Sequence, residues 1–288
     1  MVQLTASAPQ SLTRQLKIWL DGVVYADPKE ATIAGTDHGL LVGDGVFETL
    51  KVTERGAFAV RRHLNRLTRS AAALHLPKPD HQQIREAIDA VLEDRDFPRG
   101  RLRITYTGGP GPLGSDAAYG PPTLLVALAP TEPVPPRTSI VTAPWTRNEH
   151  GALAGVKSTS YAENVRGLAY ATERGASEAI FLNTARHVCE GTGTNIFLVF
   201  GDRVVTPPLS AGPLAGITRE LIMEWSLVEE RELTLDEATR ADELFITSSM
   251  RDIQGIERWD DQLLDPARPV TQALSAIFAE RSQADLDP

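Results

Sequence analysis

Lys157 is the residue of this sequence whose surroundings best suit covalent chemistry. It follows the small, apolar run HGALAGV and precedes the hydroxyl-rich run STSY. A lysine amine becomes a nucleophile when partial burial or neighbouring cations lower its pKa. We therefore expect a buried, reactive amine, and the alternative for an isolated lysine is an ordinary solvated side chain.

Glu190 is a second candidate, in the stretch CEGTGTNIF. The pattern places it at the start of a strand, and the small residues that follow would let a flat group approach. A carboxylate in this position could pair with a protonated ring nitrogen, because opposite charges favour each other's charged form. The alternative is a solvated glutamate at a strand end.

The stretch PLAGITRELIMEW predicts a helix that opens at Gly216, Ile217 and Thr218. The exposed amides at a helix start, together with the positive end of its dipole, bind phosphate. Gly216 lets the backbone come close to a ligand, and Thr218 can cap the helix while its hydroxyl reaches a phosphate oxygen. An ordinary helix cap is the alternative.

Arg66 lies one helical turn after His63 and off the apolar stripe formed by Leu64, Leu67 and Ala71. Its guanidinium could offer several donors to a phosphate. A solvated helix face is the alternative.

Together, these residues form the set needed to hold pyridoxal phosphate. The lysine would bind the cofactor covalently, the carboxylate would keep the ring nitrogen protonated, and the helix start and the arginine would hold the phosphate.

The elements that must position these residues alternate without the regular order of a βαβ barrel and without an internal repeat. Two hairpins are predicted early in the chain, around Asp21-Gly22 and around Glu54–Gly56. Apolar periodicity predicts the remaining elements. We expect helices at residues 63–76, 82–94, 164–175, 218–231 and 269–282, and strands at 101–108, 123–130, 139–145, 178–183, 194–200, 203–208 and 241–249. This pattern is typical of an α+β protein.

A proline-rich segment divides the chain. Four prolines within APTEPVPPRTS prevent a helix or a central strand and favour a stiff, extended connection. We expect a loose tail at residues 1–15, a small α+β domain at 16–128, a linker at 129–138 and a larger α+β domain at 139–288 that carries Lys157.

Composition excludes several classes of function. The net charge of -9 without a dense basic patch argues against nucleic acid and anionic membranes as partners. The single cysteine, Cys189, excludes an internal disulfide and argues against a thiolate zinc site, so we expect no metal. No signal peptide or membrane span is predicted. We expect a cytoplasmic protein.

The combined segments resemble the class IV aminotransferase family, the fold-type IV pyridoxal phosphate enzymes. This family includes branched-chain and D-amino-acid aminotransferases and 4-amino-4-deoxychorismate lyase. The resemblance covers roughly residues 18–260 and rests on GDGVFETLKV, HLNRLTRSAA, GVKSTSYAENV, EGTGTNIF, LAGITRELI and DELFITSSMRDI. It implies a two-domain α+β fold similar to D-amino-acid aminotransferase, with the active site in the interdomain cleft, closed by the linker and by a loop from a second subunit. A homodimer is therefore implied.

The resemblance also implies roles for single residues. Lys157 would be the Schiff-base lysine and would carry a proton to and from the substrate, and Glu190 would bind the pyridinium nitrogen. Leu214 would pack on the face of the ring. The phosphate would be held at the helix start and by nearby side chains, namely Arg66, Gly216, Ile217, Thr218, Ser248 and Ser249.

The residues of the substrate pocket leave the reaction open. The loop GGPGPLGSD lacks the Arg-x-His pair of D-amino-acid aminotransferases, whereas Arg103 matches an arginine of the branched-chain enzymes. Tyr161 follows the lysine one position earlier than in the branched-chain enzymes, and KSTSYAENV is closer to the lyase pattern. We expect Arg103, Arg147, Tyr161 and Arg251 to contact substrate. For Arg251 the alternative is a loop arginine paired with Asp252.

Three functions remain from this comparison. The first is an aminotransferase that moves an amino group from an amino acid or amine to a 2-keto acid, which is the commoner activity of the family. The second is 4-amino-4-deoxychorismate lyase, which releases pyruvate and p-aminobenzoate. A non-catalytic relative that only binds pyridoxal phosphate is the third, although it would be marked by loss of the lysine or the glutamate. A nucleotide-binding dehydrogenase is disfavoured further, because GGPGPLG is not a GxGxxG motif and no strand-turn-helix with a downstream acidic residue surrounds it.

Overall fold

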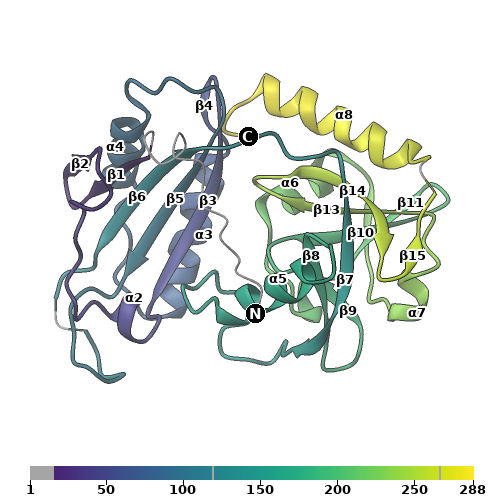
Figure 1. Cartoon of the computed structure of the whole chain (residues 1–288), viewed down its shortest axis with the longest axis horizontal. Coiled ribbons are helices and arrows are strands. Elements are labelled where there is room, and N and C mark those ends of the chain that lie inside the picture. The colour runs from purple at the N-terminus through teal and green to yellow at the C-terminus, as the bar shows by residue number, and fades with distance from the viewer. Residues whose placement is uncertain (1–15, 119, 266) are drawn as a thin grey trace. The chain divides into compact units, whose positions relative to one another are not determined.

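The computed structural model describes residues 16–118, 120–265 and 267–288, which form two compact units. The first unit contains the described residues up to Pro133, together with Lys157–Ser160 and Asp287. The second contains Val134–Val156, the described part of Tyr161–Leu286, and Pro288 (Figure 1). Lys157 thus groups with the first unit, although it follows the proline-rich segment in sequence. The predicted tail at residues 1–15 lies outside the described residues.

The first unit is built on a six-stranded antiparallel sheet. Both early hairpins are confirmed, and the turn between the first two strands places Asp21 and Gly22 at positive φ, which favours glycine. In sheet order the strands are β2 (Val23–Tyr25), β1 (Lys17–Leu20), β6 (Leu124–Pro130), β5 (Gly100–Thr107), β3 (Gly45–Thr53) and β4 (Gly56–Ala57).

Helices bury the apolar side chains of this sheet. Helix α3 (Val60–Ala73) packs on β3, and α4 (His81–Leu92) packs on β1 and β6. Helix α3 begins at Val60, three residues earlier than predicted, after Ala59 in the left-handed region. The short helix α2 (His38–Leu41) was not predicted, because four residues are too few to show a helical period.

The second unit is built on a mixed nine-stranded sheet. Neighbouring strands are parallel where β7 meets β8 and β14 and where β11 meets β12, and antiparallel elsewhere. The strands are β7 (Arg137–Arg147), β8 (Glu178–Asn183), β9 (Val188–Glu190), β10 (Asn195–Phe200), β11 (Arg203–Thr206), β12 (Val228–Glu230), β13 (Glu243–Ser248), β14 (Asp252–Trp259) and β15 (Gln262–Leu263).

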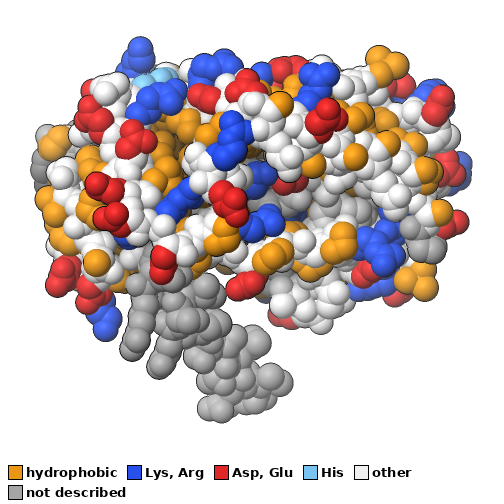
Figure 2. Space-filling model, turned by 90° about the horizontal axis from the view of Figure 1, so that it is seen from above, with side chains coloured by type: hydrophobic (Ala, Val, Ile, Leu, Met, Phe, Trp, Pro, Cys, Tyr) orange, Lys and Arg blue, Asp and Glu red, His pale blue; other side chains and the backbone are white. Residues whose placement is uncertain are grey.

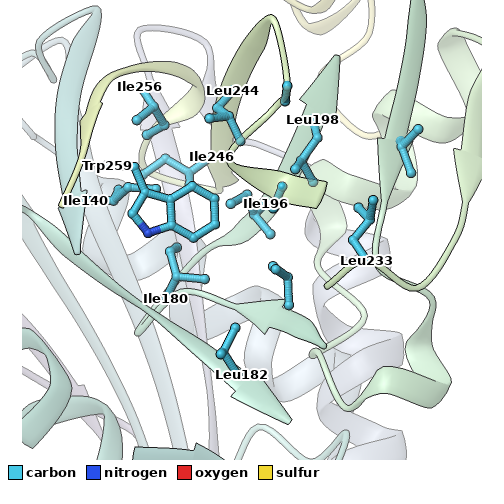
Figure 3. Packing of buried hydrophobic residues seen from close by; sticks show 14 residues of the cluster. Ile140, Ile180, Leu182, Ile196, Leu198, Leu233, Leu244, Ile246, Ile256 and Trp259 are labelled. Carbon is cyan, nitrogen blue, oxygen red and sulfur yellow. The ribbon is translucent and has the colours of Figure 1, made fainter. Parts of the chain in front are cut away.

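A large apolar cluster of this unit lies against that sheet (Figure 3). The indole of Trp259 packs among Ile140, Ile180 and Ile256, and Leu198, Leu233 and Leu244 extend the cluster. Burying each of these side chains contributes about 1.5–3 kcal/mol. The cluster contains Val188 of β9 and Leu244 and Ile246 of β13, and it therefore helps to hold the two strands that end in Glu190 and Ser248.

In the described part of the second unit, four α-helices accompany the sheet: α5 (Ala162–Thr172), α6 (Ile217–Trp225), α7 (Leu235–Ala238) and α8 (Pro269–Ala284). Helix α5 packs on β7 and β8, α6 packs on β13, and α8 packs on β13 and β14. A single 3-10 turn, Leu209–Ala211, precedes α6.

Two predictions about the extent of helices and strands in this unit were wrong. The helix expected at 218–231 ends at Trp225, because the chain then becomes extended and forms β12 beside β11. Glu190 was expected to start a strand, but it ends β9, and residues 191–194 form the connection to β10. Helical periodicity cannot detect a three-residue strand, so both differences have the same origin.

Charged side chains of both signs are interspersed over the described residues on the face that Figure 2 shows. Within the described ranges, none of the helices combines the length and the apolar character needed to cross a membrane.

Candidate active site

The backbone around Lys157 extends the edge of the first sheet. Phe47 N–H donates to the carbonyl of Lys157 at 3.0 Å, and Thr159 N–H donates to the carbonyl of Gly45 at 2.8 Å. Val46 and Ser158 form the antiparallel bridge between these two bonds. Lys157 was expected to be buried, but it is half-buried, because its segment pairs with only one strand at the sheet edge.

The amine of Lys157 lies over an aromatic ring. Its Nζ is 4.4 Å from the centre of the Phe47 ring, and the guanidinium carbon of Arg103 is 3.8 Å from the same centre. Arg103 also donates through Nε to Thr105 Oγ1 at 3.3 Å. The structure therefore brings two predicted site residues, Lys157 and Arg103, together at one ring.

A buried carboxylate lies beside this group. Glu48 is fully buried and accepts hydrogen bonds from Arg66 Nε at 2.8 Å, from Arg66 Nη2 at 2.6 Å and from His63 Nδ1 at 2.6 Å. Burial raises the pKa of Glu48, but the charge of Arg66 and the hydrogen bonds from Arg66 and His63 together outweigh it and lower the pKa to about 2. Glu48 is therefore ionised at neutral pH.

His63 behaves differently from Glu48. Burial lowers its pKa more than the hydrogen bond and charge of Glu48 raise it, and the charges of Arg66 and Lys157 lower it further. The imidazole is therefore neutral at neutral pH. Since a carboxylate only accepts, Nδ1 must carry the proton and donate to Glu48.

Glu190 lies in the second unit, at the end of β9. Its Oε2 accepts from the amide of Leu214 at 2.9 Å, and its Oε1 is 3.7 Å from Arg147 Nε. Its side chain is only 12% exposed. Two predicted cofactor residues, Glu190 and Leu214, are thus in direct contact.

Arg147 is held by several partners around Glu190. Its guanidinium stacks 4.3 Å from the centre of the Phe181 ring and donates to Glu163 at 3.1 Å and to Asn164 at 3.3 and 3.4 Å. These contacts fix the cation beside the carboxylate of Glu190.

Tyr161 braces the loop that follows Glu190. Its hydroxyl donates to the carbonyl of Thr192 at 3.0 Å, and Asn164 Nδ2 donates to the same carbonyl. Burial, with a smaller contribution from the charges of Glu190 and Glu178, raises the pKa of Tyr161 to about 12. Tyr161 is therefore a neutral hydrogen-bond donor at neutral pH.

The start of helix α6 has the predicted position but not the predicted cap. Gly216 is the N-cap, and among the described residues no side chain caps this helix, so the expected capping by Thr218 was wrong. Thr218 is the second helical residue and is buried, as is Ile217. A Cβ at Gly216 would lie 2.0 Å from Asn195 Oδ1, so this position has room only for glycine unless Asn195 moves.

Ser248 ends β13, Ser249 follows it, and Arg251 lies in the same turn. The amide of Arg251 donates to Ser248 Oγ at 3.2 Å. Its guanidinium donates to Ser177, to Gln254 and, at 3.3 Å, to Glu178 Oε1. The alternative prediction paired Arg251 with Asp252, whereas the carboxylate in the contacts described here is that of Glu178.

Glu178 connects Arg251 to the loop after Glu190. It is buried, and its Oε2 accepts from Thr192 Oγ1 and from the amide of Gly193. One carboxylate thus joins the turn after β13 to residues 192–193.

Sequence reasoning missed Glu48, His63, Asn164 and Glu178. One signal was available for Glu48, because it is a charged residue next to Phe47 in a strand whose neighbours are apolar. A charge in such a strand must have a partner, and Arg66 was already a candidate. Glu178 and Asn164 gave no comparable signal, since the partners named above lie 14 to 73 residues away from them in sequence.

Comparison with known proteins agrees with this geometry. The family model for amino-transferase class IV matches residues 45–259. This range covers most of the chain, and the chain therefore belongs to the class IV aminotransferase family.

Two relatives illustrate the range of activities. A putative branched-chain-amino-acid aminotransferase from Methanocaldococcus jannaschii is 34% identical over 92% of this chain and 96% of its own length. An aminodeoxychorismate lyase from Bacillus subtilis is 30% identical over 80% of this chain and 82% of its own length.

Solved structures show the same fold. A branched-chain aminotransferase from Thermoproteus uzoniensis superposes with a TM-score of 0.86 at 26% identity, over 92% of this chain and 93% of its own. A fold IV-transaminase from Curtobacterium pusillum superposes with a TM-score of 0.79 at 28% identity, over 92% of this chain and 99% of its own. The protein is therefore an enzyme with the two-domain fold of the fold-type IV aminotransferases.

Proposed function

We propose that this enzyme is a pyridoxal-phosphate-dependent aminotransferase that moves an amino group from an amino acid or amine to a 2-keto acid. The observation that carries the proposal is the contact of Lys157 and Arg103 with one Phe47 ring. An amine and a guanidinium that contact the same ring suit a substrate that carries both an amino group and a carboxylate.

The residues present fit pyridoxal phosphate. Helix α6 starts without a side-chain cap among the described residues, and Gly216 keeps that start open because a Cβ there would displace Asn195. Uncapped amides at a helix start suit a phosphate dianion. The buried carboxylate of Glu190, oriented by the Leu214 amide, suits a protonated ring nitrogen.

When bound, pyridoxal phosphate accepts the electrons released when a bond to the substrate's Cα breaks. Glu190 would keep the ring nitrogen protonated, which makes the ring a better electron acceptor. Leu214, whose amide fixes the carboxylate of Glu190, would pack on the face of the ring.

Lys157 would attach the cofactor through Nζ, and its amine, once released by substrate, would move the proton at the substrate's Cα. We assign the phosphate to Arg66, to the amide of Ile217, to Thr218 and to Ser249, with Ser248 adjacent.

We assign substrate binding to Arg103. The contacts of Arg147, Tyr161 and Arg251 with other protein groups favour positioning roles for them: Arg147 and Tyr161 around Glu190, and Arg251 through Glu178.

The alternative function is 4-amino-4-deoxychorismate lyase. It is supported by the Bacillus subtilis relative and by the lyase-like segment that follows Lys157. A relative from Mycobacterium tuberculosis, 27% identical over 91% of this chain, is named a bifunctional aminodeoxychorismate lyase / D-amino acid transaminase, so the two activities can occur in one protein. The non-catalytic alternative is disfavoured, because both Lys157 and Glu190 are present.

We further propose that the enzyme acts as a homodimer in the cytoplasm. The dimer is supported by the family resemblance, and the cytoplasm by the single cysteine, which favours a reducing compartment.

A half-reaction tests the function. The purified protein is loaded with pyridoxal phosphate, its visible spectrum is recorded, and single donors (D- and L-alanine, glutamate and a branched-chain amino acid) are added without a keto acid. We expect one donor to convert the bound cofactor to pyridoxamine phosphate, which chromatography of the released cofactor identifies.

A different result would identify the lyase or refute both functions. If the donors leave the cofactor unchanged while aminodeoxychorismate yields pyruvate, the enzyme is the lyase. If borohydride reduction attaches no cofactor mass to the peptide that contains Lys157, the assignment of Lys157 is wrong.

A further inference from the structure

Glu48 is a buried charged residue to which the proposed function gives no role. Glu48 is a fully buried carboxylate on β3, at the interface with helix α3. A buried charge is costly unless its partners compensate for it, and here three donors from two residues surround it.

The contact between Glu48 and Arg66 fixes the orientation of the Arg66 guanidinium. Nε and Nη2 of Arg66 donate to the two different oxygens of Glu48, at 2.8 and 2.6 Å. Because the guanidinium is planar, a two-point contact on one edge also determines where its other nitrogen points. Without Glu48, the three-carbon stem of Arg66 would allow other orientations.

His63 is the second residue that binds Glu48, and as a neutral imidazole it adds no charge. It donates through Nδ1 to Glu48 Oε2 from the same helix that carries Arg66, one turn earlier. The neutral imidazole holds the carboxylate in place, so the negative charge of Glu48 remains matched to the positive charge of Arg66.

The same helix reaches Lys157. The amide of Lys157 donates to Ser70 Oγ at 3.3 Å, and Ser70 lies one turn after Arg66. Arg66 is only 5% exposed, so its charge acts on this neighbourhood with little screening by water. A carboxylate next to Arg66 limits the positive field near the amine of Lys157.

We propose that Glu48 is a positioning residue for the cofactor phosphate. It orients the guanidinium of Arg66 toward the phosphate, and the enzyme thereby prefers pyridoxal phosphate to the unphosphorylated pyridoxal. The inference rests on the proposed function, because it takes Arg66 as a phosphate ligand.

The test compares two cofactors that differ only in the phosphate. Dissociation constants of pyridoxal phosphate and of pyridoxal are measured by absorbance for the full-length apo-protein and for Glu48→Gln. We expect Glu48→Gln to weaken pyridoxal phosphate by about tenfold to a hundredfold, as for a lost hydrogen bond to a charged group, and to change the affinity for pyridoxal by less than about twofold. A merely structural role would weaken both cofactors equally, and that result would overturn the proposal.

Two further variants make the comparison specific. Glu243 is also a buried glutamate, but its carboxylate accepts from the amides of Val270 and Thr271 at the start of helix α8. Glu243→Gln is therefore the matched control, and we expect its ratio of the two affinities to equal that of the wild type. In an Arg66→Lys background, Glu48→Gln should leave the ratio of the two affinities unchanged, because the guanidinium that Glu48 orients is already absent.

The proposal stays testable if Glu48→Gln does not fold. Arg66→Lys alone must then lower the preference for the phosphorylated cofactor, and an unchanged preference would overturn the proposal. If the wild-type protein binds neither cofactor, the proposed function itself fails. If the wild type prefers pyridoxal phosphate and Glu48→Gln keeps that preference, only the inference about Glu48 fails.

Discussion

At the scale of single residues, the clearest specificity element is Arg103. Its guanidinium and the Lys157 amine share the Phe47 ring, so Arg103 can bind a carboxylate attached to the carbon that carries the reacting amino group. We expect Arg103→Leu to raise KM for amino-acid donors by about tenfold to a hundredfold, because a charge-assisted hydrogen bond is lost.

Donors without a carboxylate provide the control for Arg103. Steady-state kinetics with a simple primary amine should show the same kcat/KM for wild type and Arg103→Leu. An equal loss for amino acids and amines would assign Arg103 to the packing of Phe47 instead.

Glu48 should also control stability in acid. Its folded-state pKa of about 2 lies below the ordinary value of 4.5, so its contribution is fully present above about pH 5 and is lost as the pH falls toward 2. The difference corresponds to about 3 kcal/mol. Urea unfolding of the apo-protein between pH 5 and pH 2 should therefore show a shallower loss of stability in Glu48→Gln than in wild type, and parallel curves would contradict the assignment.

At the scale of elements, the start of helix α6 requires a residue without a Cβ at position 216, which is Gly216. In Gly216→Ala the new carbon would meet Asn195 Oδ1 at 2.0 Å, so Asn195 must turn and its bond to the Leu214 carbonyl would be strained. We expect the affinity for pyridoxal phosphate to fall by about tenfold or more, while the fold is kept, because φ at Gly216 is -70° and suits alanine.

Gly35 offers a matched control for this substitution. A Cβ there would meet nothing within 4 Å among the described residues. Cofactor titration of Gly35→Ala should reproduce the wild-type affinity, and an equally small effect of Gly216→Ala would show that the helix start does not approach the cofactor.

The turn after β13 offers a second prediction at this scale. Arg251 contacts Glu178, and Glu178 holds Thr192 and Gly193 next to Glu190. We expect Arg251→Ala to lower kcat by about tenfold with little change in KM, since Glu178 loses a charged partner and the loop loosens. A rise in KM for carboxylate substrates with unchanged kcat would support direct substrate binding instead.

The sequence predicts elements well where their periodicity is long and poorly where they are short. Helices α3, α4 and α5 and the long strands β3 and β5 were predicted, because each repeats its apolar pattern several times. Strands β9 and β12, with three residues each, were missed. Because β9 was missed, Glu190 was predicted at the start of a strand, whereas it lies at the end of β9.

The candidate site was predictable in its main residues but not in its supports. Lys157, Glu190 and Gly216 stand in local patterns that chemistry can interpret. Glu48, by contrast, binds partners that lie 15 and 18 residues away in sequence. Glu178 binds Thr192 and Gly193, which lie 14 and 15 residues away, and Arg251, which lies 73 residues away. Only the folded chain brings such groups together.

At the scale of the whole molecule, a run of exposed apolar residues suggests a protein–protein interface. Leu40, Leu41 and Val42 are consecutive apolar residues in the first unit and are 63%, 38% and 40% exposed in the single chain. Contiguous exposed apolar side chains mark interaction surfaces more often than isolated ones do. This run lies just before β3, which carries Phe47 and Glu48, so we expect it to be covered by the second subunit of the proposed homodimer.

Leu40→Glu tests this expectation, because a charge in a dry interface is strongly unfavourable. Light scattering coupled to gel filtration should give twice the chain mass for the wild type and a larger share of single chains for Leu40→Glu, with lower specific activity at the same dilution. Leu227→Glu is the control, since Leu227 is an isolated apolar residue that is 95% exposed. If both variants remain dimeric and active, the run from Leu40 to Val42 lies outside the subunit interface. A fully active wild-type monomer would refute the homodimer itself, because the second subunit would then contribute nothing that the reaction requires.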